Sequence, residues 1–374
     1  MSYLTVAGHR SMALDMRRNR AYATALEQAV SSQSVVLDVG AGTGIHGLLA
    51  ARLGARRVYL VEPEDIIFVA EEIVRANGLQ DSVRCLHGRV QDVDIPEPVD
   101  VIVSVLTGNF LLTEDLLEAL FHARDAFLAP GGTLIPSAAI MEAVPVSAPE
   151  LHEEEIAAWS VPQHGVDLSR ARTYAANSVL YRSNVFDAVE QLAAPLALHT
   201  VEFGKGGYEG VRADVTYDVT TSGLCHGWVG WFRMRLGDGW LSTSPWDAPL
   251  HWTPAFLPLD PPLFFERGVK VNFELDRAPF GDWTWRVRTE SSVQEHTTLR
   301  AAPLNLSALK KASLDYEPAL DGEGLALKYV LSQCNGSTAV EAIARSLHDR
   351  YGEQFRTAAE SRRFVQRIVK RYVR

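Results

Sequence analysis

The stretch VVLDVGAGTGIHGLLAARLGARRVYLVE, residues 35–62, decides the fold. It opens on the apolar run 35–39, rich in valine, as expected of a strand buried on both faces of a parallel sheet. The glycines of the segment 40–44 then permit a turn that brings the backbone close to a ligand. A helical pattern follows, and a second strand over 57–61 ends at Glu62. Strand, glycine turn, helix and strand together predict one unit of an α/β sheet.

The same alternation continues on both sides of this unit. A helical pattern covers residues 9–30 upstream, and downstream the strand TLIP follows the turn Pro130-Gly131-Gly132. Between them lie helical patterns at about 65–77 and 114–127 and strand-like runs at 83–86 and 99–104. Alternating strands and helices predict a doubly wound parallel sheet. We therefore expect a Rossmann-like domain over residues 1–136.

Beyond Pro136 the pattern changes to antiparallel strands punctuated by Gly and Pro, which predicts a β-barrel or sandwich over residues 137–302. The alternating runs are 211–220, 225–236, 269–275 and 282–290. Helical pieces such as HEEEIAAW and FDAVEQLA predict an inserted arm over about 150–196. From residue 303 to 374 the helical period returns, with Ser337 as a candidate cap, so we expect a third, small helical domain.

The composition excludes several classes of protein. The chain has 374 residues, with 36 Lys and Arg against 46 Asp and Glu, for a net charge of −10. An acidic chain lacks the positive field that a nucleic-acid backbone requires, so we expect no nucleic-acid partner. No apolar run is long enough for a membrane span or a secretory signal. Cys85, Cys225 and Cys334 lie far apart, which predicts no metal site and a reducing, cytoplasmic location.

The glycine turn is the candidate cofactor site. Asp38 stands two residues before Gly40 in a G-x-G-x-G motif. A dinucleotide fingerprint would need its third glycine at Ile45, so that fit is poor. G-x-G-x-G with an acid two residues before it instead resembles the cofactor loop of class I S-adenosylmethionine methyltransferases. Glu62, at the end of the second strand, can accept both hydroxyls of a ribose, which a dinucleotide and S-adenosylmethionine both contain. A purely structural turn is the remaining alternative.

Further motifs resemble those of one family. Residues 9–22 contain His9, Met12, Asp15, Arg18 and Tyr22 at the spacing of the helix that covers the cofactor in protein arginine methyltransferases. SVLTGNFLLTEDLL (104–117) is similar to that family's double-glutamate loop. LSTSPWDAPLHW (241–252) is similar to its threonine-histidine-tryptophan loop, with leucine in place of the threonine. The resemblance covers about residues 9–300. It implies S-adenosylmethionine (SAM) as cofactor and S-adenosylhomocysteine as product.

The resemblance implies a role for each matched residue. Arg18 would pair with the carboxylate of SAM, and Glu62 would bind its ribose. Glu114, the second glutamate of the loop, and His251 would be catalytic, with Asp15 as the carboxylate partner that orients the imidazole of His251. The other implied cofactor contacts are His9, Met12, Asp38, Gly40, Gly42, Val90 and Gln91.

The double-glutamate loop departs from the family pattern. The first glutamate falls on Val105, and the usual methionine and tyrosine fall on Thr107 and Asn109. Two carboxylates suit the fork of a guanidinium, so the loss of one favours an uncharged acceptor beside Trp252, a possible aromatic wall. We therefore expect methyl transfer to an amine, ring nitrogen or electron-rich carbon of a small-molecule or short-peptide natural product.

Two other functions stay open. The first is a peptide or protein arginine N-methyltransferase that works with Glu114 alone. The second is a non-catalytic SAM-binding scaffold, which the missing glutamate favours and the intact cofactor motifs oppose. The family's arm closes a dimer, so the resemblance also implies a homodimer.

The C-terminal segment carries a separate resemblance. Residues 326–351, including Cys334, Gly336, Glu341 and Ile343, look like the PqqD-like, winged-helix peptide-binding fold. That resemblance implies recognition of a leader peptide, and the basic last helix, RRFVQRIVKRYVR, would suit an acidic one. A helical cap that only packs on the β domain or the dimer is the alternative.

Overall fold

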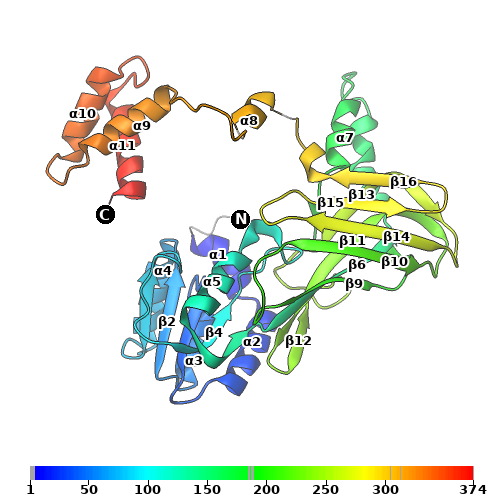
Figure 1. The fold of residues 1–374 in the computed structure, drawn as a ribbon, viewed down its shortest axis with the longest axis horizontal. Helices are drawn as coiled ribbons and strands as arrows, with labels where there is room; N and C mark the ends of the chain where they lie inside the picture. The colour runs from blue at the N-terminus through cyan, green and yellow to red at the C-terminus, as the bar shows by residue number, and fades with distance from the viewer. Residues whose placement is uncertain (1–4, 184–185, 187–188, 304, 312, 374) are drawn as a thin grey trace. The chain divides into compact units, whose positions relative to one another are not determined.

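The computed structural model describes residues 5–183, 186, 189–303, 305–311 and 313–373. The chain forms two compact units, Met1–Pro303 and Leu304–Arg374. All three β-sheets belong to the first unit, and the second is helical (Figure 1). A boundary inside the first unit, between a domain over 1–136 and one over 137–302, remains our proposal.

A parallel sheet in the order β3-β2-β1-β4-β5 forms the first half of unit 1, and the prediction of a Rossmann-like fold is confirmed. Its strands are β1 (Val35–Val39), β2 (Arg57–Glu62), β3 (Val83–His87), β4 (Val99–Ser104) and β5 (Leu128–Ile135). Helices α3 (Ile45–Arg52), α4 (Ile66–Ala76) and α5 (Leu117–Phe127) connect them, with the short helix η1 (Thr113–Asp115) before α5. The chain leaves β1 and β4 in opposite directions across the sheet. A crevice for a ligand is expected at the carboxyl ends of such strands.

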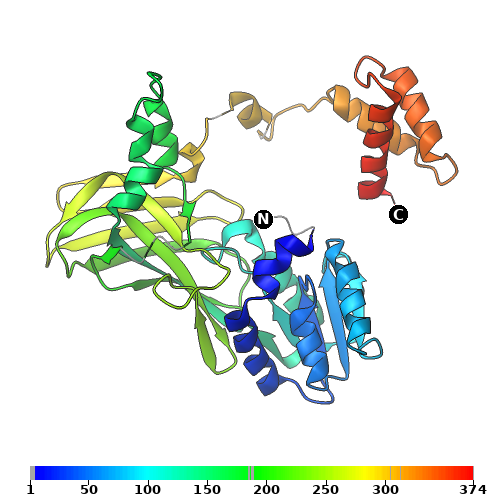
Figure 2. The same ribbon diagram turned by 180° about the vertical axis from the view of Figure 1, so that it is seen from behind.

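The predicted helix over 9–30 is in fact two helices, α1 (Val6–Ala13) and α2 (Met16–Ala29). The break falls at Asp15, whose carboxylate accepts a hydrogen bond of 3.0 Å from the backbone N–H of Arg18 and thereby caps α2. Helix α2, dark blue in Figure 2, packs against α3 and against the β domain. The hydroxyl of Tyr22 donates to the backbone oxygen of Ser104 at 2.9 Å, which fixes α2 to the end of β4.

Two antiparallel sheets form the β domain, as predicted. The larger comprises β6 (Ala138–Ser147), β7 (Leu180–Tyr181), β8 (Glu190–Gln191), β9 (Leu196–Glu202), β11 (Gly223–Leu236), β12 (Gly239–Ser242) and β13 (Ala255–Phe265). The smaller comprises β10 (Val211–Asp218), β14 (Lys270–Arg277), β15 (Thr284–Arg288) and β16 (Val293–Thr297), followed by the short helix η4 (Thr298–Arg300). Apolar side chains of both sheets meet in the core, where Trp228 stacks on Phe273 with ring centroids 4.7 Å apart.

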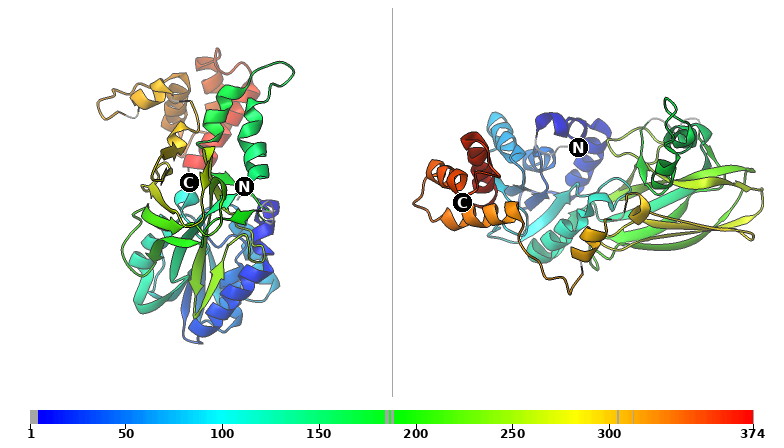
Figure 3. Two further views of the ribbon diagram at one scale, coloured as in Figure 1. Left: turned by 90° about the vertical axis from the view of Figure 1, so that its right-hand side faces the viewer. Right: turned by 90° about the horizontal axis from the view of Figure 1, so that it is seen from above.

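The arm projects from the β domain (Figure 3). It is built from α6 (Pro149–Glu155), η2 (Ala157–Ser160), η3 (Ser169–Ala171) and α7 (Arg172–Ala175). At its base, Arg172 donates two hydrogen bonds, of 2.8 and 2.6 Å, to the carboxylate of Asp260 on β13. The predicted helix FDAVEQLA is wrong, because Glu190–Gln191 pair as strand β8 with β6; its residues 187 and 188 lie outside the described residues.

The second unit has its own hydrophobic core, centred on Val330, Leu347 and Val365. Its helices are α8 (Leu306–Lys311), α9 (Gly322–Gln333), α10 (Val340–Arg350) and α11 (Ala358–Tyr372). The prediction that Ser337 caps the middle helix is wrong: Ala339 is the N-cap, and the Ser337 hydroxyl instead donates to Asn335. Among the helices that the structure describes, none has the length and apolar character needed to cross a membrane.

Candidate active site

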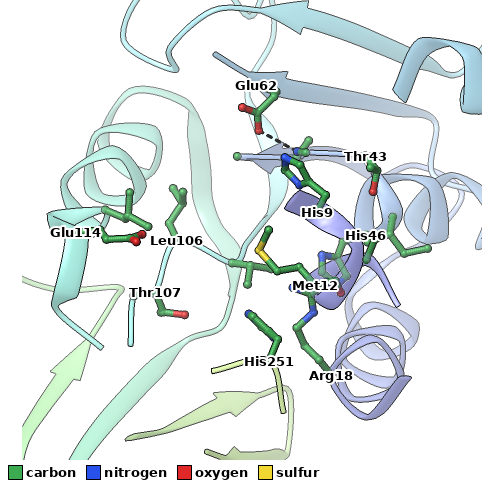
Figure 4. A pocket seen from close by; sticks show the side chains of 18 of the residues that line it. His9, Met12, Arg18, Thr43, His46, Glu62, Leu106, Thr107, Glu114 and His251 are labelled. Carbon is green, nitrogen blue, oxygen red and sulfur yellow. Dashed lines mark hydrogen bonds between the residues drawn. The ribbon is translucent and has the colours of Figure 1, made fainter. Parts of the chain in front are cut away.

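A cavity of about 320 Å³ lies where β1, β2 and β4 end (Figure 4). The glycine loop and the first turn of α3 form one part of its wall, and the loop after β4 forms another. Helices α1 and α2 and the segment around His251 contribute the rest. The cavity therefore draws on segments from both halves of the first unit.

The glycine loop has the backbone that its sequence predicts. Gly40, Gly42 and Gly44 adopt φ values of 69°, 54° and 82°, a region that other residues rarely enter. A side chain at position 42 would also come within 3.0 Å of the His9 ring. The loop and α1 thus approach closely, and α1 covers this side of the cavity.

Glu62 is 6% exposed and lines the cavity. One carboxylate oxygen accepts a 2.9 Å hydrogen bond from the backbone N–H of Gly42, and the other accepts one of 3.0 Å from Glu64 (Figure 4). Burial raises the pKa of Glu62, and the two backbone hydrogen bonds oppose that rise. A carboxylate has lone pairs beyond these two bonds, so Glu62 retains capacity to accept from ribose hydroxyls.

Arg18 is the buried cation of the cavity and is 3% exposed. Its guanidinium donates to the backbone oxygen of Met12 at 2.6 Å and to the side chain of Asn19 at 3.1 Å. Across the described residues it makes no ion pair within 4.0 Å. Burial lowers the pKa of Arg18. A buried guanidinium without a carboxylate fits the negative end of an amino-acid ligand.

Asp15 and His251 form a nearly buried pair, with side chains 6% and 7% exposed. One oxygen of Asp15 lies 3.0 Å from the imidazole Nδ1 of His251 and accepts from the His251 backbone N–H at the same distance. Burial would raise the pKa of Asp15, but its hydrogen bonds, chiefly from His251, lower it. Burial lowers the pKa of His251, against the effect of Asp15. At neutral pH the imidazole is neutral and its orientation is fixed.

The loop after β4 is held by the β domain. The indole N–H of Trp252 donates to the backbone oxygen of Thr107 at 2.9 Å, and the backbone N–H of Thr253 donates to the Asn109 side chain at 3.0 Å. Glu114 lies further along the loop with φ 77°, an uncommon value for a residue other than glycine. Val105, Thr107, Asn109, Glu114 and Trp252 all line the cavity.

Four of the predicted site residues do not line this cavity. Asp15 stands behind His251. Asp38 is buried and accepts a 2.8 Å hydrogen bond from the backbone N–H of Gly47, so it supports the start of α3. Burial raises the pKa of Asp38 to about 7. Val90 is buried and Gln91 exposed, both outside the cavity wall.

The sequence reasoning missed other residues of the wall. His46 lines the cavity beside Arg18, and Leu106 faces the glycine loop. A polar residue in the first turn of the helix that follows a glycine loop is the one signal that could have indicated His46. Among the described residues no group of acidic, histidine and cysteine side chains is arranged to hold a metal ion.

Two family models match the chain. Residues 22–156 match the ribosomal protein L11 methyltransferase model, and residues 137–288 match the arginine methyltransferase oligomerization subdomain. Protein arginine N-methyltransferase 6 of Xenopus tropicalis is 31% identical over 74% of this chain and 85% of its own length. The probable protein arginine N-methyltransferase 6 of Arabidopsis thaliana is 44% identical over 45% of this chain, which spans 39% of that relative.

Solved structures of protein arginine methyltransferases are similar to this chain in fold. The Trypanosoma brucei PRMT1 enzyme-prozyme complex with AdoHcy superposes with a TM-score of 0.73 at 25% identity, over 79% of this chain and 99% of that one. Arabidopsis thaliana protein arginine methyltransferase 10 superposes with a TM-score of 0.67 at 23% identity, over 79% and 99%, which shows a common fold.

The glycine loop, the buried carboxylate of Glu62 and a buried Arg18 with no ion pair among the described residues fit one class of protein, the SAM-dependent methyltransferases, and SAM is the cofactor. Within that class the chain belongs to the protein arginine methyltransferase family. The main functional prediction, a small-molecule or short-peptide natural-product acceptor, is wrong, because the relatives are named protein arginine N-methyltransferases. That prediction rested on Val105, which lines the cavity together with Glu114.

Proposed function

We propose that this protein is a protein arginine N-methyltransferase. One observation carries the proposal: Glu114 lines the same cavity as Arg18 and Glu62. A carboxylate in the wall of the cofactor cavity suits a guanidinium, which it binds through charge-assisted hydrogen bonds. The family membership of the chain supports arginine as the acceptor.

In this proposal each residue has a distinct task. Bound SAM supplies an electrophilic methyl group on its sulfonium. Arg18 holds the carboxylate of the cofactor, Glu62 its ribose, and His9 and Met12 cover it from α1. Glu114 holds the acceptor guanidinium so that one nitrogen faces the methyl group, and this orientation lowers the barrier. The half-buried side chain of Val105 leaves the second guanidinium nitrogen without a carboxylate partner.

Methylation of a guanidinium nitrogen releases one proton, which needs an acceptor. His251 suits this task, because its lowered pKa leaves it neutral at pH 7 and Asp15 fixes its ring. The resulting imidazolium would lie beside the carboxylate of Asp15, whose charge stabilises it. We propose Asp15 as a positioning residue, because it stands behind His251 and outside the cavity wall.

The replacement Val105→Glu tests the proposal. A second carboxylate on this wall would pair with the free guanidinium nitrogen. We therefore expect kcat/KM for an Arg-Gly-rich peptide to rise about tenfold or more. Mass spectrometry of peptides incubated with SAM measures the gain of one methyl group per arginine. A peptide with lysine in place of arginine should stay unmodified.

Val105→Gln is the matched control, since it adds the same length without the charge. Equal activity of the two variants would contradict a guanidinium acceptor at this wall. Methylation of the lysine peptide at the same rate as the arginine peptide would contradict it as well.

We propose that the protein forms a homodimer through its arm. Residues 137–288 match an oligomerization subdomain. The arm also carries large apolar side chains that are open to solvent, which is typical of an interaction surface. These are Trp159, Val161, Val166, Leu168 and Tyr174, between 37% and 58% exposed.

A charge at the arm should dissociate the dimer. Val166 on the arm and Val293 on β16 are equally exposed, at 58% and 59%. Val166→Asp should give a light-scattering mass of one chain at micromolar concentration, while wild type and Val293→Asp give that of two. A single-chain mass for the wild type would contradict the homodimer, and a two-chain mass for Val166→Asp would contradict the role of the arm.

The PqqD-like resemblance of the second unit predicts an acidic peptide partner, and five basic residues of α11 support it: Arg362, Arg363, Arg367, Lys370 and Arg371. The three cysteines are all free thiols, which agrees with a cytoplasmic location.

A further inference from the structure

His46 occupies an unusual place for a histidine. It is the second residue of α3, directly after the glycine loop, and it is 3% exposed. Its ring stacks on Tyr22 with centroids 4.4 Å apart and an interplanar angle of 28°. It also lines the cavity, next to Arg18 and Met12 (Figure 4). The stacking on a buried tyrosine holds the ring in one orientation.

The imidazole Nε2 of His46 is a buried polar atom without a hydrogen-bond partner among the described residues. Such an atom costs free energy, because it has left water without gaining a bond. An apolar residue at this position would avoid that cost. The unpartnered atom therefore points to a ligand in the cavity that completes the hydrogen bond.

The charge of the His46 ring determines which ligand groups can form a hydrogen bond with it. Burial lowers the pKa of His46 well below its ordinary value, and the nearby charge of Arg18 acts in the same direction. His46 is thus a neutral imidazole at pH 7, with one nitrogen that donates and one that accepts. It can bond with either end of a zwitterion, whereas the neighbouring Arg18 can only donate.

We propose that His46 binds the amino-acid end of the cofactor through its Nε2, together with Arg18. Arg18 binds the carboxylate. His46 forms a hydrogen bond with a polar group of the amino-acid end that Arg18 does not bind. The inference concerns the cofactor alone and does not depend on arginine as the methyl acceptor. His46 thereby adds a cofactor contact that the glycine motif did not predict.

Calorimetric titration with two ligands tests this assignment. S-adenosylhomocysteine carries the amino-acid end, and 5′-methylthioadenosine has the same nucleoside without it. His46→Leu should weaken binding of S-adenosylhomocysteine about tenfold, because one hydrogen bond is lost, and leave binding of 5′-methylthioadenosine unchanged. His46→Gln, whose amide also donates and accepts, should recover part of the loss.

The nucleoside ligand serves as the folding control within each variant. Unchanged binding of S-adenosylhomocysteine by His46→Leu would overturn the proposal. An equal loss for both ligands would also overturn it, because it would assign His46 to the packing of the glycine loop. Recovery by glutamine would not be expected if only the stacking on Tyr22 mattered.

Discussion

Glu114→Gln should lower kcat/KM for an arginine peptide about 100-fold or more. The substitution keeps the shape of the side chain but removes the charge, and a hydrogen bond to a charged group contributes about 1.5–3 kcal/mol. A neutral amide also holds the guanidinium nitrogen less firmly toward the methyl group. Binding of S-adenosylhomocysteine should stay as in wild type, because Arg18 and Glu62 lie on other segments. Initial rates and calorimetry measure the two effects separately.

Glu118→Gln is the control for this prediction. Glu118 is exposed in the first turn of α5, four positions along the chain, and it does not line the cavity. It should keep the wild-type rate. Full activity of Glu114→Gln would refute the role given to Glu114. A parallel loss of S-adenosylhomocysteine binding would show that the substitution disturbs the cofactor side instead.

Arg277→Met should destabilise the first unit by about 3 kcal/mol or more. Arg277 donates two hydrogen bonds, of 2.8 and 2.6 Å, to the carboxylate of Asp115, and both side chains are nearly buried. The Tyr208 hydroxyl and the backbone N–H of Phe280 donate to the same carboxylate. Methionine would leave that charge buried without its cation. Chemical denaturation at pH 7 measures the change in the free energy of unfolding.

The same pair predicts a pH dependence. Burial would raise the pKa of Asp115, but the hydrogen bonds from Arg277 and Tyr208 hold it at about 2, below its ordinary 3.8. A lowered pKa means that the pair contributes its full stability above pH 3.8 and loses it as the pH falls toward 2. The difference between wild type and Arg277→Met should therefore shrink over that interval. A difference that stays constant from pH 6 to pH 2 would refute this account.

Arg212→Met provides the matched control on the same sheet. Arg212 pairs with Asp276 across β10 and β14, but their side chains are 90% and 53% exposed, so the pair should contribute less than about 1 kcal/mol.

Arg277→Met should also lower the methylation rate without weakening cofactor binding, because Asp115 adjoins Glu114 in a loop with left-handed backbone at both residues. Unchanged kcat/KM would show that the ion pair does not position Glu114.

The local patterns in the sequence were enough to predict the parallel sheet and its cofactor loop. Valine-rich strands, the glycines and Glu62 lie within one stretch of chain, and their geometry follows from their order. The break before α2 was missed, because a helical period continues through Asp15 while its carboxylate caps the start of a new helix. The FDAVEQLA segment failed for another reason: its short apolar pattern fits helix and strand alike, and pairing with β6 decided it.

The contacts that assemble the site are long-range and leave no local trace. Asp115 and Arg277 are 162 positions apart, and Asp15 and His251 are 236 apart. Only the resemblance to the protein arginine methyltransferases suggested the pair Asp15 and His251, and no feature of the sequence suggested the pair Asp115 and Arg277. The acceptor prediction was wrong because it took the loss of one of two carboxylates, at Val105, as evidence for an uncharged acceptor. The position of Glu114 on the cavity wall depends on tertiary contacts of the loop that no sequence pattern records.

Asp15 serves two structures with one carboxylate. One oxygen caps α2, the helix that carries Arg18, and the other accepts from the backbone and ring of His251 in the β domain. Any swing of the start of α2 that lets product leave must also withdraw the carboxylate from that imidazole. In the function proposed above, His251 would then be an oriented proton acceptor only while the start of α2 stays in place.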